Sequence, residues 1–443
     1  MATVLPTGLS VYAYPSFRQV EVEQAAGSSD QSGRWIVLLV SALLLAMVFL
    51  QKLGPPAAGS HIELVLILTY ALLAFLLLRQ VVMISATRLC LLAVLLATMA
   101  ISQWLSQQSW GLTAVLIVLA LYCPFIFVLP VSRPNYLRIL NSFQLAMLVI
   151  CVIVALQQLV QFTIGARFWP NLSEILPSAL QVPGYNYLRE TAYESGIFMP
   201  NGVFFLEPSI VSQFFAIAIA VEIAWFRRWR LVAYVAGLLL TLAGSGLFVL
   251  AVASPFLLFP LGKRFLPLAL AALVALLPVA QAVGWVDQIA ARANEFGKPG
   301  SSGYIRYTQP IDDMVGRLTA RPGQIVSGAG AGSTLADPGH NSLGLTKLVN
   351  EYGLLVALAF YAFIFACVFA GAPSLALAWA VFVYYSIGGG GLSVAIYALP
   401  LFYFAALMRI VPDGGEEAAE DAASLEDESG ALYLNRSVPL GPR

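Results

Sequence analysis

His340 is the residue with the clearest capacity for chemistry, because it is one of only two histidines in 443 residues. It stands just ahead of an apolar run that begins near Leu345, and Asn341 or Ser342 is available to cap a helix there. The dipole at a helix amino terminus disfavours a protonated imidazole, which keeps the ring competent as a base near neutral pH. We therefore take His340 as the candidate catalytic residue, supported by Asn341. The alternative is an interfacial histidine with no catalytic task.

Arginine and glutamate side chains stand in the polar segments between the apolar runs. Arg189 is either an anion ligand or, alternatively, an interfacial anchor or the partner of a nearby glutamate. Glu207 directly precedes Pro208, a pair that suits a helix start because proline lacks the amide hydrogen that a first turn leaves unused. Arg306 comes just before a short helix that is expected to begin at Pro310, and it has no obvious partner nearby in the sequence.

Two further sequence patterns, a run of alternating glycines and a pair of adjacent carboxylates, are candidates for a ligand site. The alternating glycines of Gly328 to Gly332 either expose backbone amides to a phosphate or form a flexible loop. Asp312 and Asp313 are adjacent carboxylates, but no other ligating side chains cluster with them in the sequence. We therefore expect no metal site. The four cysteines fall inside apolar runs, where a thiol packs as a small hydrophobic group.

The composition indicates a membrane protein, because 60% of the residues are hydrophobic and only 10% are charged. We expect an all-α polytopic membrane protein with about twelve transmembrane helices, each in an apolar run of roughly the length that a bilayer requires. The runs are 35–50, 62–78, 89–101, 112–129, 142–162, 210–226, 231–242, 247–261, 265–283, 345–369, 374–387 and 394–408.

Basic residues in the short loops predict the orientation, because lysine and arginine are retained on the cytoplasmic side during insertion. With the amino terminus inside, the short cytoplasmic loops carry nine basic residues, and the short outer loops carry Lys52 alone. The topology is therefore N-in and C-in, with two long outer loops at 166–207 and 284–342. The predicted domains are a cytoplasmic leader (1–34), a transmembrane domain (35–409) and an acidic, disordered cytoplasmic tail (410–443).

The amount and distribution of charge argue against two functional classes, namely nucleic-acid binding and ion-coupled transport. The formal net charge is zero, which gives no indication of a nucleic-acid partner. The apolar runs contain few ionisable residues and no pair of broken spans, which weakens an ion-coupled transporter. Glu222 stands near a cytoplasmic end beside Arg227, and its carboxylate is expected to reach the membrane interface.

Two stretches resemble the O-antigen ligase and polymerase family, which includes Wzy-like polysaccharide polymerases. RETAYESGIFMPNGVFFLEPS is similar to the outer-loop arginine and Glu-Pro pattern of that family. SSGYIRY, a Gly-x-Gly-x-Gly run and HNSLGLTKLVNEYGLL together are similar to its large periplasmic loop and the helix that follows. The likeness extends to the predicted topology of almost the whole chain, except for the acidic tail.

The resemblance implies inverting, metal-independent glycosyl transfer from an undecaprenyl diphosphate-linked oligosaccharide, without a cofactor, at the periplasmic face of the bacterial inner membrane. It implies that His340 is the base and that Arg189 and Arg306 bind the diphosphate, with Arg317 and Arg321 as reserves.

Within the family we favour a polymerase of exopolysaccharide or O-antigen repeat units. The alternatives are a ligase that transfers the glycan to another acceptor, and a non-enzymatic flippase or exporter of lipid-linked sugars. The acidic tail is either a solvated terminus or a docking segment for a basic cytoplasmic partner such as a chain-length regulator.

Overall fold

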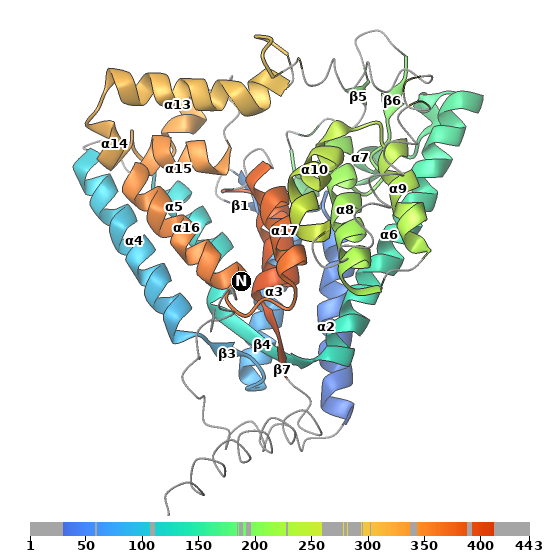
Figure 1. The fold of residues 1–443 in the computed structure, drawn as a ribbon, viewed down its shortest axis with the longest axis horizontal. Helices are drawn as coiled ribbons and strands as arrows, with labels where there is room; N and C mark the ends of the chain where they lie inside the picture. The colour runs from blue at the N-terminus through green and yellow to red at the C-terminus, as the bar shows by residue number, and fades with distance from the viewer. Residues whose placement is uncertain are drawn as a thin grey trace, which may run out of the picture.

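The computed structural model describes residues 30–57, 60–106, 111–183, 185, 189–191, 196–226, 229–258, 278, 281, 294, 296–301, 303–336, 343–387 and 392–411. These residues are mainly helical, and Figure 1 shows a bundle that is broad at its upper end and narrows toward a small sheet at its lower end. By length and composition, three described helices are long and apolar enough to cross a membrane: Ala86–Ser106, Arg133–Thr163 and Pro208–Phe226.

The elements have the following bounds. The helices are α2 (Asp30–Phe49), α3 (Leu64–Leu78), α4 (Ala86–Ser106), α5 (Leu112–Tyr122), α6 (Arg133–Thr163), α7 (Leu172–Ile175), α8 (Pro208–Val221), α9 (Arg230–Leu240), α10 (Gly244–Leu258), α13 (Gln309–Ala320), α14 (Gln324–Ser327), α15 (Gly344–Tyr352), α16 (Leu354–Val368), α17 (Leu375–Ile387) and α18 (Ala395–Leu401). The π-helical segments are η4 (Glu222–Phe226), η6 (Tyr304–Thr308) and η8 (Phe402–Ala406). The strands are β1 (Pro56–Ala57), β2 (Ser60–His61), β3 (Met83–Ile84), β4 (Phe127–Ser132), β5 (Arg189–Glu190), β6 (Phe198–Met199) and β7 (Met408–Val411).

Helices lie in the predicted runs from 35–50 to 247–261 and from 345–369 to 394–408, whereas the run 265–283 falls outside the described residues apart from 278 and 281. The predicted leader ends at residue 34, but α2 already begins at Asp30. Within 112–129 the α-helix ends at Tyr122, because Pro124 begins a short 3-10 turn that leads into β4.

Gly353 divides the predicted run 345–369 into two helices, α15 and α16. Its φ of +85° lies in the left-handed region, and a Cβ atom at this position would lie 2.2 Å from the carbonyl oxygen of Val326. The chain therefore turns where the hydropathy of the run indicates one continuous span. This turn gives α15 a direction of its own, and α15 is the helix that follows His340.

A three-stranded sheet closes the lower end of the bundle (Figure 1). Strand β4 pairs antiparallel with β3 and parallel with β7, so segments that are far apart in the sequence meet there. The side chain of Arg88 is 5% exposed and donates hydrogen bonds, 2.9–3.1 Å long, to the carbonyl oxygens of Phe125, Phe127, Cys367 and Ala406. One guanidinium group thus holds the sheet, α4 and the end of α16 together.

We expect Arg88→Met to destabilise the fold by about 3 kcal/mol or more, because it leaves several buried carbonyl groups without a donor. The measurement is the melting temperature of the detergent-solubilised protein. Arg138→Met is the matched control, since the side chain of Arg138 is exposed and donates to Asn135 within its own helix. An equal loss of melting temperature in both variants would contradict the structural role of Arg88.

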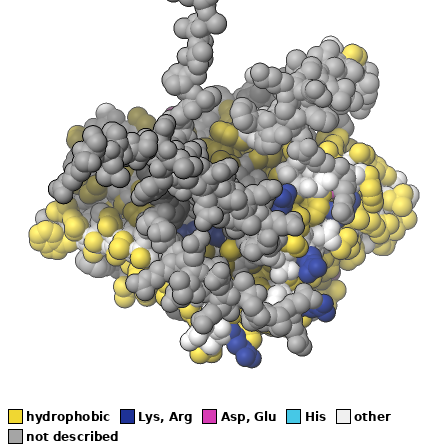
Figure 2. Space-filling view, turned by 60° about the horizontal axis from the view of Figure 1, so that its bottom comes forward, with side chains coloured by type: hydrophobic (Ala, Val, Ile, Leu, Met, Phe, Trp, Pro, Cys, Tyr) yellow, Lys and Arg dark blue, Asp and Glu magenta, His cyan; other side chains and the backbone are white. Residues whose placement is uncertain are grey.

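The lower face carries basic side chains among apolar ones. Figure 2 brings this face forward and shows several Lys and Arg side chains, with no Asp or Glu side chain visible on the described surface in that view.

Glu222 differs from the expectation, because its carboxylate does not reach an interface. The residue is fully buried in η4, and its Oε1 atom lies 3.4 Å from the Nε atom of Arg230, which is 4% exposed. Arg230 also donates to Asn141 Oδ1 over 2.9 Å, and its guanidinium group lies 5.2 Å from the ring centre of Phe226. Because α6 and α9 pack around this end of the helix, the carboxylate of Glu222 pairs with Arg230 and not with water. The position of Glu222 near Arg227 in the sequence did not indicate this partner.

Candidate functional site

Helix α8 carries one edge of the candidate site at its amino terminus, opposite the end that holds Glu222. The sequence of α8 is mostly apolar, and every residue of the helix except Ser209 is buried against α6, α9, α10 and α17. The helix begins at Pro208, as the Glu-Pro pair predicts. Glu207 is therefore fixed at the head of a helix that has little freedom to move.

The turn before α8 is held by polar groups from other segments. The amide of Gly202 donates to Gln157 Oε1 over 2.8 Å, and the amide of Val203 donates to Asn201 Oδ1 over 3.0 Å. Lys52 donates its ammonium hydrogen to the carbonyl oxygen of Val203, and burial lowers the pKa of Lys52 to about 7. These contacts give the end of the first polar loop a defined shape.

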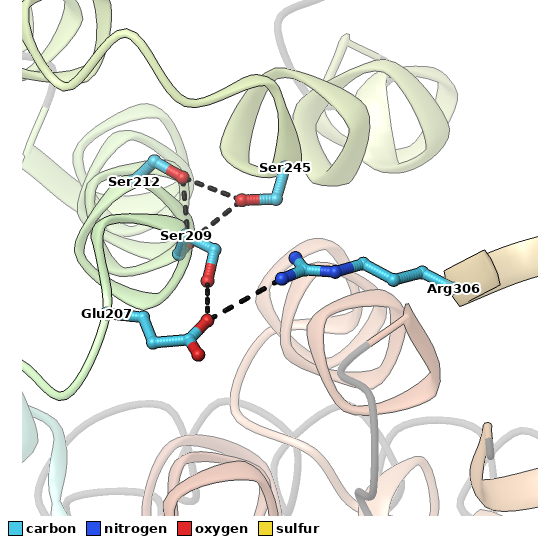
Figure 3. A network of polar contacts seen from close by, with 5 residues as sticks. All are labelled: Glu207, Ser209, Ser212, Ser245 and Arg306. Carbon is cyan, nitrogen blue, oxygen red and sulfur yellow. Dashed lines mark hydrogen bonds and ion pairs between the residues drawn. The ribbon is translucent and has the colours of Figure 1, made fainter. Parts of the chain in front are cut away.

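An ion pair joins the two polar loops. The Nη2 atom of Arg306, in η6, lies 3.8 Å from the Oε2 atom of Glu207, and the two side chains are 32% and 21% exposed (Figure 3). The hydroxyl of Ser209 donates to the same carboxylate oxygen over 2.9 Å. Arg306 thus has its partner in the other loop, while its guanidinium group remains accessible to a ligand.

Serine side chains fix α10 against the first turn of α8. The hydroxyls of Ser212 and Ser245 lie 2.9 Å apart, and both donate to the carbonyl oxygen of Ser209 (Figure 3). A Cβ atom on Gly246 would lie 2.2 Å from the carbonyl oxygen of Ser212, so this contact requires glycine. The predicted short spans on either side of Ser245 are therefore two helices joined by a tight turn.

Glu63 is a second carboxylate near the ion pair. Its Oε1 atom accepts a hydrogen bond of 3.0 Å from the amide of Ala395, at the start of α18. Burial raises the pKa of Glu63 to about 8, although the amides of Ala395 and Ile396 lower it. A carboxyl group that titrates near neutral pH has the acidity of a general acid or base.

Tyrosine side chains connect Glu63 with the ion pair. Burial raises the pKa of Tyr185, and electrostatic effects of Glu63, Tyr397 and Glu207 raise it further, so these three groups lie within electrostatic range of its hydroxyl. The hydroxyl of Tyr397 is in turn within electrostatic range of Glu207 and Arg306. The result is a polar and aromatic cluster that is built from five separate stretches of the chain.

We expect Glu63→Gln to flatten the pH dependence of stability. The folded-state pKa lies above the usual value of 4.5, so the folded protein binds more protons and its unfolding free energy falls as the pH rises from about 4.5 to about 8. Glutamine keeps an acceptor for the Ala395 amide but cannot ionise.

The variant should therefore melt a few degrees higher than the wild type at about pH 9 and equally at about pH 4. The measurement is the melting temperature across this range. Tyr185, Tyr397, Glu207 and Arg306 face the same cluster and are present in both proteins. A parallel decline in the two proteins would contradict a raised pKa at Glu63.

Helix α15 contacts a segment of the chain that also contacts Glu63. It carries polar residues that are nevertheless buried, namely Thr346, Lys347, Asn350 and Glu351. The ammonium group of Lys347 donates to Ser393 Oγ over 3.1 Å. Ser393 lies two residues before Ala395, so the segment 392–395 contacts both α15 and Glu63.

The glycine-rich stretch Gly328 to Gly332 packs against α15. The amides of Gly328, Ala329, Gly330 and Ala331 donate to the oxygens of Gln324 (2.9 Å), Asn350 (2.7 Å), Glu351 (3.1 Å) and the Gln103 side chain (2.7 Å). A Cβ atom on Gly328 would lie 2.4 Å from the backbone carbon of Glu351. These four amides are therefore not available to a phosphate, and the glycines permit close backbone packing instead.

The predicted site residues have different outcomes. His340 and Asn341 lie outside the described residues. Arg189 is partly exposed on β5, which pairs with β6 in the first loop. Arg317 lies in the last turn of α13 and Arg321 follows it, with an exposed side chain.

Arg321 lies far from Arg306 along the helix. From the helical rise, the two Cα atoms lie about 20 Å apart along the axis, and a role for Arg321 as a reserve ligand stays a prediction.

Glu63, Tyr185 and Tyr397 of the cluster, and Lys347 beside it, were not predicted from the sequence. The signal for Glu63 and Lys347 was a charge at the edge of, or inside, an apolar run. Among the described residues, no group of three or more His, Cys, Asp or Glu side chains is placed to hold a metal ion.

Comparison of the chain with protein-family models, with curated proteins and with solved structures gives no match. The assignment of a function therefore depends on the residues of the site and on their arrangement.

Proposed function

We propose that this protein is a membrane glycosyltransferase that polymerises undecaprenyl diphosphate-linked oligosaccharide repeat units at the periplasmic face of the bacterial inner membrane. The observation that carries the proposal is the ion pair between Glu207 and Arg306. The two stretches that resemble the O-antigen ligase and polymerase family are far apart in the sequence, and this contact joins them. A shared site of this kind is what a common substrate for both stretches requires.

The positions of the basic connecting segments support an N-in and C-in topology. The β3–β4–β7 sheet gathers the α3–α4 and α5–α6 connections with the end of η8, and these segments carry arginines such as Arg79, Arg133 and Arg409. The last turn of α8 lies near Arg230 and Asn141, close to the start of α6 and to this basic face. Glu207 directly precedes the first turn of α8, so it lies at the helix end away from the basic face. In the proposed topology the basic face is cytoplasmic and the cluster is periplasmic.

The proposed reaction is a single displacement with inversion. An acceptor hydroxyl attacks the anomeric carbon of the donor glycan, and its proton passes to the imidazole of His340. The new carbon–oxygen bond forms as the bond to the diphosphate oxygen breaks. Undecaprenyl diphosphate leaves with the bonding electrons, and its charge is stabilised by Arg306 and Arg189. The donor linkage already stores the required energy, so the reaction needs no nucleotide or other cofactor.

The roles of the carboxylates follow from their positions. Glu207 holds the guanidinium group of Arg306 at the head of α8 and leaves its remaining donors for the diphosphate. Tyrosines and a carboxyl group are suitable for the hydroxyls and ring faces of a saccharide, and Tyr185, Tyr397 and Glu63 supply them in the cluster. The site thus combines a phosphate-binding edge with a sugar-binding wall.

The product of purified protein in proteoliposomes tests the proposal. With a lipid diphosphate-linked repeat unit as the only substrate, a polymerase lengthens the lipid-linked glycan. A ligase forms no ladder from this substrate but transfers glycan to an added lipid A core acceptor. A flippase moves the substrate across the bilayer without making a glycosidic bond. Either of the last two results would overturn the polymerase assignment.

A further inference from the structure

Lys347 is a buried lysine that forms no ion pair with any described residue. Its side chain is 7% exposed, and within the described part of the chain its one polar contact is the hydroxyl of Ser393, 3.1 Å from the ammonium nitrogen. A hydroxyl group accepts a hydrogen bond but carries no negative charge. Buried charges are normally paired with an opposite charge, because removal from water is costly.

Its place in α15 also argues against a purely structural role. Lys347 is the fourth residue of a nine-residue helix. A positive charge in the first turns of a helix is disfavoured by the helix dipole, which places partial positive charge at the amino terminus. An anion bound there would be favoured by both the ammonium group and the dipole.

Neighbouring residues connect Lys347 with the ion pair between Glu207 and Arg306. Its partner Ser393 belongs to the segment 392–395, whose Ala395 amide donates to Glu63 over 3.0 Å. Beyond it, the Tyr397 hydroxyl is within electrostatic range of Arg306. Helix α13, which follows Arg306, also packs against α15. Lys347 and Arg306 therefore both lie near the stretch 392–397.

We propose that Lys347 binds a phosphate oxyanion of the lipid-linked donor and thereby forms, together with Arg306, the cationic lining of the site. This inference rests on the proposed function for the identity of the ligand. In the resting protein the ammonium group is held by Ser393, and on binding it pairs with the phosphate. Phospholipid headgroups present the same chemistry, so the test separates the two sources.

Direct binding of inorganic pyrophosphate provides the test, without any sugar donor. We expect Lys347→Met to raise the dissociation constant for pyrophosphate about 10- to 100-fold, because a charge-assisted hydrogen bond is lost. Lys347→Arg should retain most of the affinity. Lys298→Met is the matched control at an exposed lysine and should bind as the wild type does. Unchanged affinity in Lys347→Met would overturn the proposal.

A second arm examines the phospholipid source. Protein in nanodiscs of phosphatidylglycerol is compared with protein in phosphatidylcholine, and retained lipid is counted by native mass spectrometry. A loss of bound phosphatidylglycerol in Lys347→Met, with unchanged pyrophosphate affinity, would assign the cation to a membrane headgroup and overturn its role toward the donor. Equal lipid retention with weakened pyrophosphate binding is the expected result.

Melting temperatures separate a ligand site from a structural one. Without ligand, Lys347→Met should melt at or above the wild-type temperature, because it removes an uncompensated buried charge. If Lys347→Met and Ser393→Ala both melt lower and bind pyrophosphate normally, the lysine is structural and the proposal fails. Wild-type protein that binds pyrophosphate through Lys347 but makes no glycan would leave this inference standing and overturn the proposed function instead.

Discussion

Replacing Arg306 with glutamine should lower the rate of glycosyl transfer about 10²–10³-fold, the usual cost of removing a donor that stabilises a developing negative charge. The guanidinium group is 32% exposed beside Glu207, so it is accessible to the departing diphosphate and contributes little to the packing of the core. We therefore expect the variant to keep its fold and its melting temperature. The rate is measured as glycan ladder formation in proteoliposomes.

The control variants separate charge from geometry at this position. Arg306→Lys keeps a positive charge but loses the planar, two-point contact, so it should be intermediate in rate. Arg321→Gln should be nearly neutral, because Arg321 lies beyond the far end of α13 with an exposed side chain. Glu207→Gln should slow the reaction less than Arg306→Gln, since it releases the guanidinium group without removing it. Equal losses in Arg306→Gln and Arg321→Gln would show that only the overall positive charge of the loop matters.

Replacing His340 with alanine should lower the rate of glycosyl transfer about 10²–10⁴-fold, which is the range that a positioned general base contributes. The acceptor hydroxyl must lose its proton during the attack, and an aliphatic hydroxyl is a weak nucleophile while it keeps that proton. The effect should appear in the turnover number more than in the Michaelis constant for the donor. Added imidazole should restore part of the activity, because it returns a base to the space left by the side chain.

The other histidine of the chain is the matched control. His61 lies in the short β1–β2 hairpin, and His61→Ala should keep wild-type activity. The measurement is single-turnover transfer with saturating donor. A folded His340→Ala variant that turns over at the wild-type rate would exclude the imidazole as the base. Glu63, whose pKa of about 8 suits proton transfer, would then be the residue to examine.

Local signals in the sequence predicted much of the fold. Proline before an apolar run marks the start of α8 at Pro208, as predicted. The predicted helix start at Pro310 is wrong, because α13 begins at Gln309 and continues the helical segment η6, so Arg306 lies within the helical segment and not before it. The long apolar runs likewise indicate helices, because a helix satisfies its backbone hydrogen bonds within one segment.

Contacts between distant segments could not be predicted in this way. The partner of Arg306 is Glu207, in the other polar loop, and nothing near Arg306 in the sequence indicates it. The break at Gly353 is hidden in an apolar run, since it depends on the approach of the Val326 carbonyl. Glu63 and Lys347 acquire their significance from the segment 392–395, which reaches them only through the tertiary fold.

We propose that the site around Glu207 and Arg306 transfers sugar from a lipid diphosphate. The ratio of released undecaprenyl diphosphate to new glycosidic bonds tests this proposal most directly. Wild-type protein in proteoliposomes receives the lipid-linked repeat unit in the presence of EDTA, and both the released undecaprenyl diphosphate and the new glycosidic bonds are quantified. We predict equal amounts of the two products from the wild type and little of either from Arg306→Gln. Folded wild-type protein that releases no undecaprenyl diphosphate and forms no glycosidic bond would contradict the claim.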